Sequence, residues 1–151
     1  MNRRQILLAL ALMPVMASAG GNHGGGHEAM TGTPGESAEV DRTIEVSMND
    51  QMRFAPESIR VEAGQTVRFA VKNTGQQPHE MVIGSLNELK AHAEQMREQP
   101  GMKHNEPNMI RLDAGESGEI VWHFPSAGEV DFACLIPGHL EAGMKGTIDV
   151  R

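Results

Sequence analysis

The stretch that decides the fold lies near the C-terminus and reads Cys134-Leu135-Ile136-Pro137-Gly138-His139-Leu140-Glu141-Ala142-Gly143-Met144. Sulfur and imidazole side chains recur in it at regular spacing: Cys, four residues, His, four residues, Met. Strand-like segments flank it on both sides, which predicts a loop that joins two strand ends. Pro137 stiffens this loop, and Gly138 allows a turn directly before His139.

The segments around this loop alternate apolar and polar residues, as half-buried strands do. Turn residues such as Asn49-Asp50 and Ala63-Gly64 separate them. The predicted strands are residues 43–48, 58–61 (entered through 54–57), 66–71, 79–84, 108–112, 118–124, 129–134 and 145–150. Short strands at this spacing predict an all-β fold, a β-sandwich.

One segment has helical periodicity instead. Ser85 followed by Glu88 fits a capping box. The apolar residues that then recur at helical spacing are Leu86, Leu89, Ala93 and Met96. Pro100-Gly101 ends the run, which predicts a helix over residues 86–98, inserted among the strands.

Length and charge limit the classes of function. A chain of 151 residues indicates one folded domain. With 4 Phe, 1 Trp and no Tyr, its core must rest on aliphatic side chains and Met. The net charge of −7 argues against nucleic acid and against an anionic membrane surface as partners.

The N-terminus has the order of a secretory signal: Arg3 and Arg4, an apolar run over 6–12, then Ala17-Ser18-Ala19. The apolar run is too short to span a bilayer, so the mature form is predicted to have no membrane insertion. Cleavage near Ala19 predicts a periplasmic protein, and the arginine pair leaves twin-arginine export open beside the general secretory route. The alternative is a buried amphipathic helix.

Three regions follow from this division: a signal peptide at 1–19, a flexible tail at 20–39 and the folded domain at 40–151. The tail is rich in Gly, Ser, Thr and Pro and has no periodicity.

The single cysteine, Cys134, becomes informative in an exported chain. An unpaired thiol in an oxidising compartment is expected to be buried, paired with another chain or held by a metal. One thiolate, two imidazoles and a weak axial thioether are the donors of mononuclear copper electron-transfer sites. The loop offers one imidazole, and His79, at the start of a predicted strand, offers the second from outside the loop.

Each of these residues alone has a plainer interpretation. A His is more often on the surface, a Met more often packs, and Cys134 by itself is compatible with an inert core thiol. The joint pattern is far more specific. A thiol enzyme with Cys134 as nucleophile is another possible class of function, but no group that would stabilise an oxyanion and no second Cys are evident. The sequence therefore favours a metal-binding protein that is not an enzyme.

From about Thr43 to Val150 the chain resembles the cupredoxins, the group of plastocyanin, azurin and rusticyanin. The landmarks that carry the resemblance are Phe54-Ala55-Pro56, Gly64-Gln65-Thr66-Val67, Pro78-His79 and the loop from Cys134 to Met144. The resemblance implies a Greek-key β-sandwich with one type 1 copper at one end. It implies the copper ligands His79, Cys134, His139 and Met144.

The inserted helix and the wording of the Cys134–Met144 loop resemble the periplasmic copper-tolerance cupredoxins more closely, which also carry a His- and Met-bearing tail. One position departs from the wider family, where Asn or Ser often follows the first His ligand. Here that residue is Glu80. Its backbone N–H is still expected to donate to the Cys134 sulfur, and its charge is expected to favour Cu(II).

Further His and Met residues lie outside this set. His23, His27 and Met30 lie on the predicted tail, which is interpreted either as a tentative second copper site or as a plain linker. Cleavage after Gly20 would create an N-terminal Gly21-Asn22-His23 chelate for Cu(II), whereas cleavage after Ala19 prevents it.

The insert holds His92, Met96, Met102, His104 and Met109, whose role the sequence does not assign. His92 and Met96 are one helical turn apart and either share a copper-binding face or divide between solvent and core. Met81 is expected to pack beside the site, and His123 is interpreted as structural.

Two functions fit this pattern. The first is copper tolerance with cycling between Cu(I) and Cu(II), for which copper ions are the partner. The second is an electron shuttle between respiratory proteins, in which an apolar patch around His139 docks a redox partner. The patch residues proposed for this are Leu135, Ile136, Leu140 and Ala142.

Overall fold

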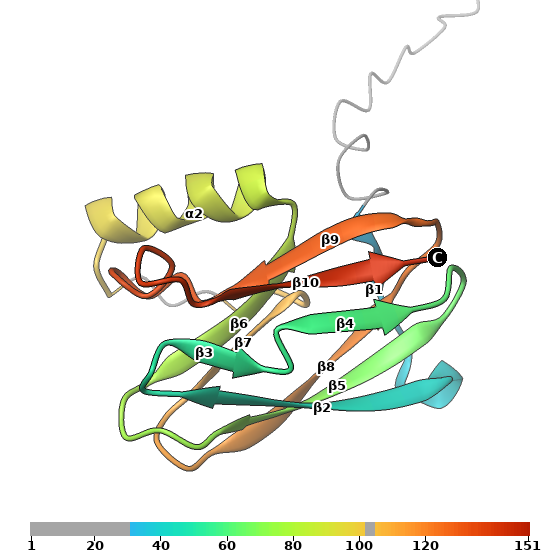
Figure 1. Ribbon diagram of the computed structural model, residues 1–151, viewed down its shortest axis with the longest axis horizontal. Helices are drawn as coiled ribbons and strands as arrows, with labels where there is room; N and C mark the ends of the chain where they lie inside the picture. The colour runs from blue at the N-terminus through green and yellow to red at the C-terminus, as the bar shows by residue number, and fades with distance from the viewer. Residues whose placement is uncertain (1–30, 102–104) are drawn as a thin grey trace, which may run out of the picture.

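The computed structural model describes residues 31–101 and 105–151, whose strands form two sheets packed face to face (Figure 1). The first sheet has the order β1-β8-β5-β2-β3, and the second has the order β4-β10-β9-β6-β7. The strands are β1 Thr33–Pro34, β2 Arg42–Asn49, β3 Arg53–Ala55, β4 Ser58–Val61, β5 Thr66–Asn73, β6 His79–Gly84, β7 Met109–Leu112, β8 Ser117–His123, β9 Gly128–Ala133 and β10 Lys145–Val150. The β-sandwich predicted from alternation is confirmed.

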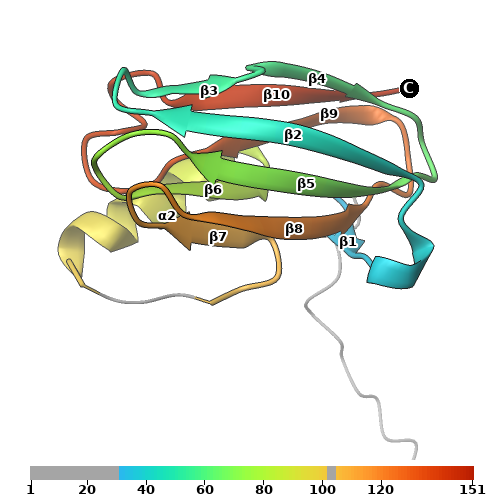
Figure 2. The same cartoon turned by 90° about the horizontal axis from the view of Figure 1, so that it is seen from below.

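Several connections between strands lie together at one end of the sandwich. Strands β2 and β5 pair in parallel, as do β4 and β10, while the other paired strands run antiparallel. The β2–β3 turn, the β5–β6 connection and the long β9–β10 loop consequently lie together at the end opposite the C-terminus (Figure 2). Cys134–Met144 forms that long loop, as its position between two predicted strands required.

The core lies between the sheets and contains every phenylalanine of the chain. Phe54 and Phe132 meet edge to face with ring centroids 5.0 Å apart. Phe69 and Phe124 do the same at 6.2 Å. Because edge-to-face pairs add to the free energy gained by burial alone, these two contacts stabilise a core that is otherwise aliphatic.

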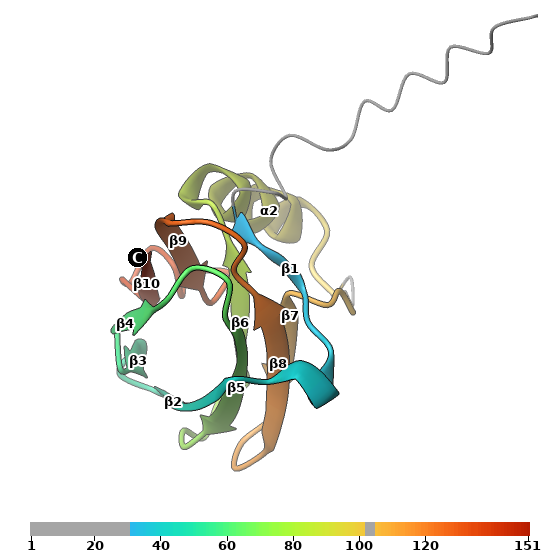
Figure 3. The same ribbon diagram turned by 90° about the vertical axis from the view of Figure 1, so that its right-hand side faces the viewer.

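Helix α2 spans Leu86–Glu98, the predicted range. It begins with the predicted capping box, in which the Ser85 hydroxyl accepts from the Glu88 backbone and the Glu88 carboxylate accepts from the Ser85 backbone. The helix buries Leu89, Ala93 and Met96. Figure 3 shows it lying over the outer side of the second sheet, beside β9 and β6.

This helix explains why β6 is buried on both faces. All six residues of β6 are buried, whereas β4 alternates exposed and buried positions. Beneath the helix lies a separate apolar cluster of Val82, Leu89, Ala93, Ala133 and Leu135. The strand that begins with His79 is therefore enclosed by the main core on one side and by α2 on the other.

The structure differs from the predicted tail at residues 31–39. Thr33 and Pro34 pair with β8, Ser37–Glu39 form the short 3-10 helix η1, and the Trp122 indole N–H donates to the Thr31 carbonyl at 2.7 Å. Composition favoured a linker, but the β8 edge of the sheet accepts this segment as an added strand.

The predicted signal peptide and residues 20–30 lie outside the described residues. Among those described, no helix is long and apolar enough to cross a bilayer.

Substitution of Gly146 by alanine tests the close packing of β10 against Phe132 of β9 and against the Glu57 backbone. A Cβ at this position would overlap the Phe132 ring and lie 2.5 Å from the Glu57 carbonyl oxygen. Gly146→Ala is therefore expected to lower the free energy of unfolding by about 1–3 kcal/mol. The neighbouring, exposed Lys145→Ala is the control and should change it by less than about 0.5 kcal/mol. Urea unfolding of metal-free protein measures both, and equal midpoints for the two variants would contradict the packing described here.

Candidate metal centre

Four side chains from two parts of the chain, the start of β6 and the β9–β10 loop, meet at one end of the sandwich. His79 is the first residue of β6, Cys134 follows β9 directly, His139 lies within the loop, and Met144 precedes β10 directly. His79, Cys134 and Met144 are 0% exposed, and His139 is 8% exposed. The cluster is therefore almost closed to water, with His139 nearest to it.

The donor atoms converge. His79 Nδ1 lies 3.3 Å from His139 Nδ1, and the Cys134 Sγ lies 3.3 Å from that same His139 nitrogen. Within the described residues, His79, Cys134 and His139 form the one group of three or more His, Cys, Asp or Glu side chains whose ligand atoms all lie within 4.8 Å of one another. Two imidazole nitrogens and a sulfur that face one another in a buried space fit a soft metal ion.

Met144 closes the loop through its backbone. Its N–H donates to the His139 carbonyl at 3.0 Å, and its carbonyl accepts from the Cys134 N–H at 3.1 Å. Gly138 and Gly143 take the left-handed conformation, with φ of +89° and +93°, at the two tight turns between these residues. The turn predicted at Gly138 is present, and the loop residues that carry the donors hold one another in register.

Two arginines brace the loop from outside. Arg53 of β3 donates to the Ala142 carbonyl at 3.1 Å, and Arg97 of α2 forms an ion pair with Glu141. Both contacts lie at the surface, so each alone contributes little to the free energy of unfolding. Together they hold the loop against β3 on one side and the inserted helix on the other.

Cys134 sits in an apolar environment that disfavours its charged form. Burial raises the pKa of its thiol to about 12, although the Glu80 backbone N–H points at the sulfur and opposes this rise. That N–H lies 3.4 Å from Sγ, which confirms the predicted contact. A metal that binds the thiolate must therefore displace a tightly held proton.

Glu80 is a buried carboxylate beside the cluster, with 1% of its surface exposed. Its Oε1 accepts from the Leu135 backbone N–H at 3.0 Å, which ties the start of the loop to β6. Its charge also acts to raise the pKa of Cys134. Glu80, which stands where Asn or Ser is usual, thus forms a hydrogen bond to the loop and places a negative charge next to the sulfur.

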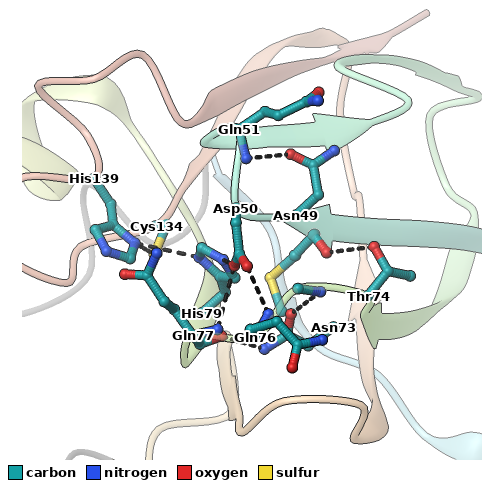
Figure 4. A network of polar contacts seen from close by, with 12 residues as sticks. Asn49, Asp50, Gln51, Asn73, Thr74, Gln76, Gln77, His79, Cys134 and His139 are labelled. Carbon is teal, nitrogen blue, oxygen red and sulfur yellow. Dashed lines mark hydrogen bonds and ion pairs between the residues drawn. The ribbon is translucent and has the colours of Figure 1, made fainter.

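Asp50 was missed by the sequence analysis, which took Asn49-Asp50 only as a turn signal. Its Oδ1 lies 3.0 Å from His79 Nε2, the ring nitrogen that faces away from the cluster (Figure 4). Hydrogen bonds from the Gln76 backbone N–H and then from the His79 ring lower the pKa of Asp50. Asp50 precedes His79 by 29 positions, and only the pairing of the two turns in space reveals the contact.

The remaining His and Met residues lie apart from this cluster. Met81 is fully buried in the main core, as expected, and His123 Nδ1 lies 3.1 Å from the Thr66 hydroxyl, which agrees with a structural role. Met96 belongs to the buried face of α2, while His92 is half-buried beside it. Met109 packs against the cluster beneath the helix. Met102, His104 and the tail residues His23, His27 and Met30 lie outside the described residues.

The raised pKa of Cys134 predicts that metal-free protein loses stability at alkaline pH. The thiol has a pKa of about 12 in the fold against an ordinary 9.0, so above pH 9 the unfolded chain loses its proton first. The unfolded state then binds fewer protons, and the free energy of unfolding falls as pH rises. Cys134→Ser should remove this component. Urea unfolding of both proteins at pH 7 and pH 10 measures the difference in pH dependence, and parallel curves would contradict the assignment.

The sequence model of the family described as copper binding proteins, plastocyanin/azurin family, matches residues 40–151. A "Copper-resistant cuproprotein CopI" of Rubrivivax gelatinosus is 48% identical over 151 residues, which cover 95% of this chain and 92% of that protein. A protein of the same description from Pseudomonas aeruginosa is 33% identical over 99% of this chain and 98% of its own length.

A solved structure of auracyanin B is similar in fold, with a TM-score of 0.64 and 27% identity over 80% of this chain and 96% of that one. The resemblance to cupredoxins is therefore confirmed, and His79, Cys134, His139 and Met144 are positioned as a type 1 copper site. The chain belongs to the plastocyanin/azurin family of copper-binding proteins.

Proposed function

We propose that this chain is an exported copper protein that protects the cell against excess copper. In this proposal His79, Cys134, His139 and Met144 bind one type 1 copper, which cycles between Cu(I) and Cu(II). The observation that carries the proposal is the buried convergence of two imidazole nitrogens and one thiol within 4.8 Å of one another. The copper-resistant cuproproteins that are similar over nearly the whole chain support the assignment to copper resistance.

The chemistry of the donors suits both oxidation states. Thiolate and thioether sulfur favour Cu(I), and imidazole serves Cu(II), so bound copper supplies a one-electron couple. The chain contributes a donor set that is held in place before the metal arrives. His79 is fixed on a doubly buried strand, and the other three donors lie on a loop closed by its own backbone hydrogen bonds.

Export and the tail belong to the same proposal. The predicted signal at 1–19 would deliver the chain to the periplasm. The His23, His27 and Met30 side chains of the tail would offer a second, weaker copper site before the folded domain. The Thr31 carbonyl accepts a hydrogen bond from the Trp122 indole, which attaches this first described residue to the sandwich.

The electron shuttle remains the alternative, and one observation favours it. His139 is the donor nearest to solvent, and Pro137 and Gly138 beside it are exposed. Ile136 and Leu140 are half-buried, so part of the predicted apolar patch is present at the surface. Leu135 was wrongly included in that patch, because it is 1% exposed and packs beneath α2.

Visible absorption and EPR spectra test the proposed copper site. Addition of Cu(II) to the mature protein should produce an intense visible band from thiolate-to-copper charge transfer, and Cys134→Ser should abolish it. Met81→Leu is the matched control, because Met81 is a fully buried core methionine outside the donor set. It should keep the band. A colourless wild-type protein would overturn the assignment of Cys134 as a copper ligand.

Growth in excess copper tests the biological role. Deletion of the gene should lower the copper concentration that the cells tolerate, because the protein no longer binds copper outside the cytoplasm. The wild-type gene should restore tolerance and the Cys134→Ser gene should not, with equal protein levels checked by immunoblot. Growth in excess zinc serves as the control. Unchanged copper tolerance in the deletion strain would refute the role in resistance and favour the electron shuttle.

A further inference from the structure

We propose that Asp50 is a positioning residue of the metal centre, which fixes the His79 ring so that Nδ1 faces the metal and whose charge favours Cu(II). This inference rests on the proposed function, since it takes His79 as a copper ligand. It concerns a residue outside the donor set, in a turn between two strands of the other sheet.

The contact between Asp50 and His79 determines which ring nitrogen carries the proton. An ionised carboxylate only accepts hydrogen bonds, so the Nε2 that lies 3.0 Å from Asp50 Oδ1 must be the donor. The other nitrogen, Nδ1, then keeps its lone pair. That nitrogen is the one that lies 3.3 Å from His139 Nδ1, within the donor cluster.

The carboxylate is itself held in place. The Gln76 backbone N–H donates to Oδ2 at 2.7 Å, and the Gln77 backbone N–H lies 3.2 Å from Oδ1. These residues belong to the connection that leads directly into His79. The buried Asn73 side chain fixes the same connection by donating to the Gln77 carbonyl at 2.7 Å. Figure 4 shows how Asp50 spans the gap between this connection and the imidazole.

Gly75 makes this approach possible. A Cβ at Gly75 would overlap Asp50 Oδ1 and lie 2.7 Å from Asp50 Cγ. Any larger side chain must therefore push the carboxylate away from its position beside His79 Nε2. This gives a way to disturb the contact that leaves both Asp50 and His79 chemically intact.

The expected consequence concerns the balance between oxidation states. A carboxylate that accepts from the outer nitrogen of a metal-bound imidazole raises the basicity of the ligating nitrogen. Its negative charge also stabilises the more positive Cu(II) form more than Cu(I). The Asp50 side chain is 33% exposed, so solvent screens part of this charge, and the orienting hydrogen bond adds to what remains.

Three variants separate the orienting effect from the charge. Asp50→Asn keeps the shape and one acceptor oxygen but removes the charge, and Asp50→Ala removes both. Gly75→Ala keeps the charge but displaces it. Asp149→Asn is the control for the overall loss of one charge, because Asp149 lies near the C-terminus and pairs with Arg60 and Arg151.

Two measurements are made on these proteins. The first is nitrogen NMR of the metal-free protein at mildly alkaline pH, which reports the tautomer of His79. The second is the Cu(II) affinity of the loaded protein relative to its Cu(I) affinity, from potentiometric titration. Wild type should hold the Nε2–H tautomer. Asp50→Ala and Gly75→Ala should lose it and lower the relative Cu(II) affinity by about tenfold or more.

Asp50→Asn should retain the tautomer and show a smaller loss of relative Cu(II) affinity, while Asp149→Asn should match wild type. An unchanged tautomer and an unchanged affinity ratio in both Asp50 variants would overturn the inference. If Asp50→Ala fails to fold, Asp50→Asn and Gly75→Ala decide the question by the same readouts. A wild-type protein without the thiolate-to-copper band would instead refute the copper site itself, which keeps the two failures distinguishable.

Discussion

The arrangement of this end of the molecule depends on one constraint: two imidazole nitrogens and a thiol sulfur must face one another with almost no water between them. Buried polar atoms that lack a partner destabilise a fold. Other contacts must therefore hold these donor atoms in place around the metal site. Two backbone hydrogen bonds within the loop hold them there. The Cys134 N–H donates to the Met144 carbonyl, and the Met144 N–H donates to the His139 carbonyl. Because the donors are held before a metal binds, little of the binding free energy is needed to order the loop.

Two carboxylates lie around the donors, at different depths. Glu80 is buried and acts next to the sulfur, whereas Asp50 is partly exposed and acts on the outer nitrogen of His79. In the redox role proposed here, both charges would favour the higher oxidation state of a bound copper ion. A centre so biased gives up an electron more readily once it holds Cu(I). In the proposed cycling between Cu(I) and Cu(II), such a bias would favour the oxidised form of the centre.

The sequence predicted the parts of the fold that depend on local pattern. Alternation located the strands, and the Ser85–Glu88 capping box with the Pro100-Gly101 stop predicted the limits of α2. The parts that depend on distant contacts escaped it. Asp50 has the signature of a turn residue, and its contact with His79 arises only when two turns meet. Leu135 was predicted to lie in a surface patch, but it packs beneath α2. Residues 31–39 were predicted to belong to the tail, but Thr33 and Pro34 pair with β8.

The inserted helix, which covers Leu135, also affects the loop that carries three of the donors. By covering the outer face of β6 and β9, it buries Val82, Ala133 and Leu135 on a side that an uncovered sheet would expose to water. Its Arg97 then reaches the loop through Glu141, and Arg53 holds the opposite side through the Ala142 carbonyl. A loop fixed on both flanks, with one donor on a doubly buried strand, has little freedom to follow a change in the metal's charge. In the proposed redox role, this restraint would limit the rearrangement of the donors that accompanies electron transfer.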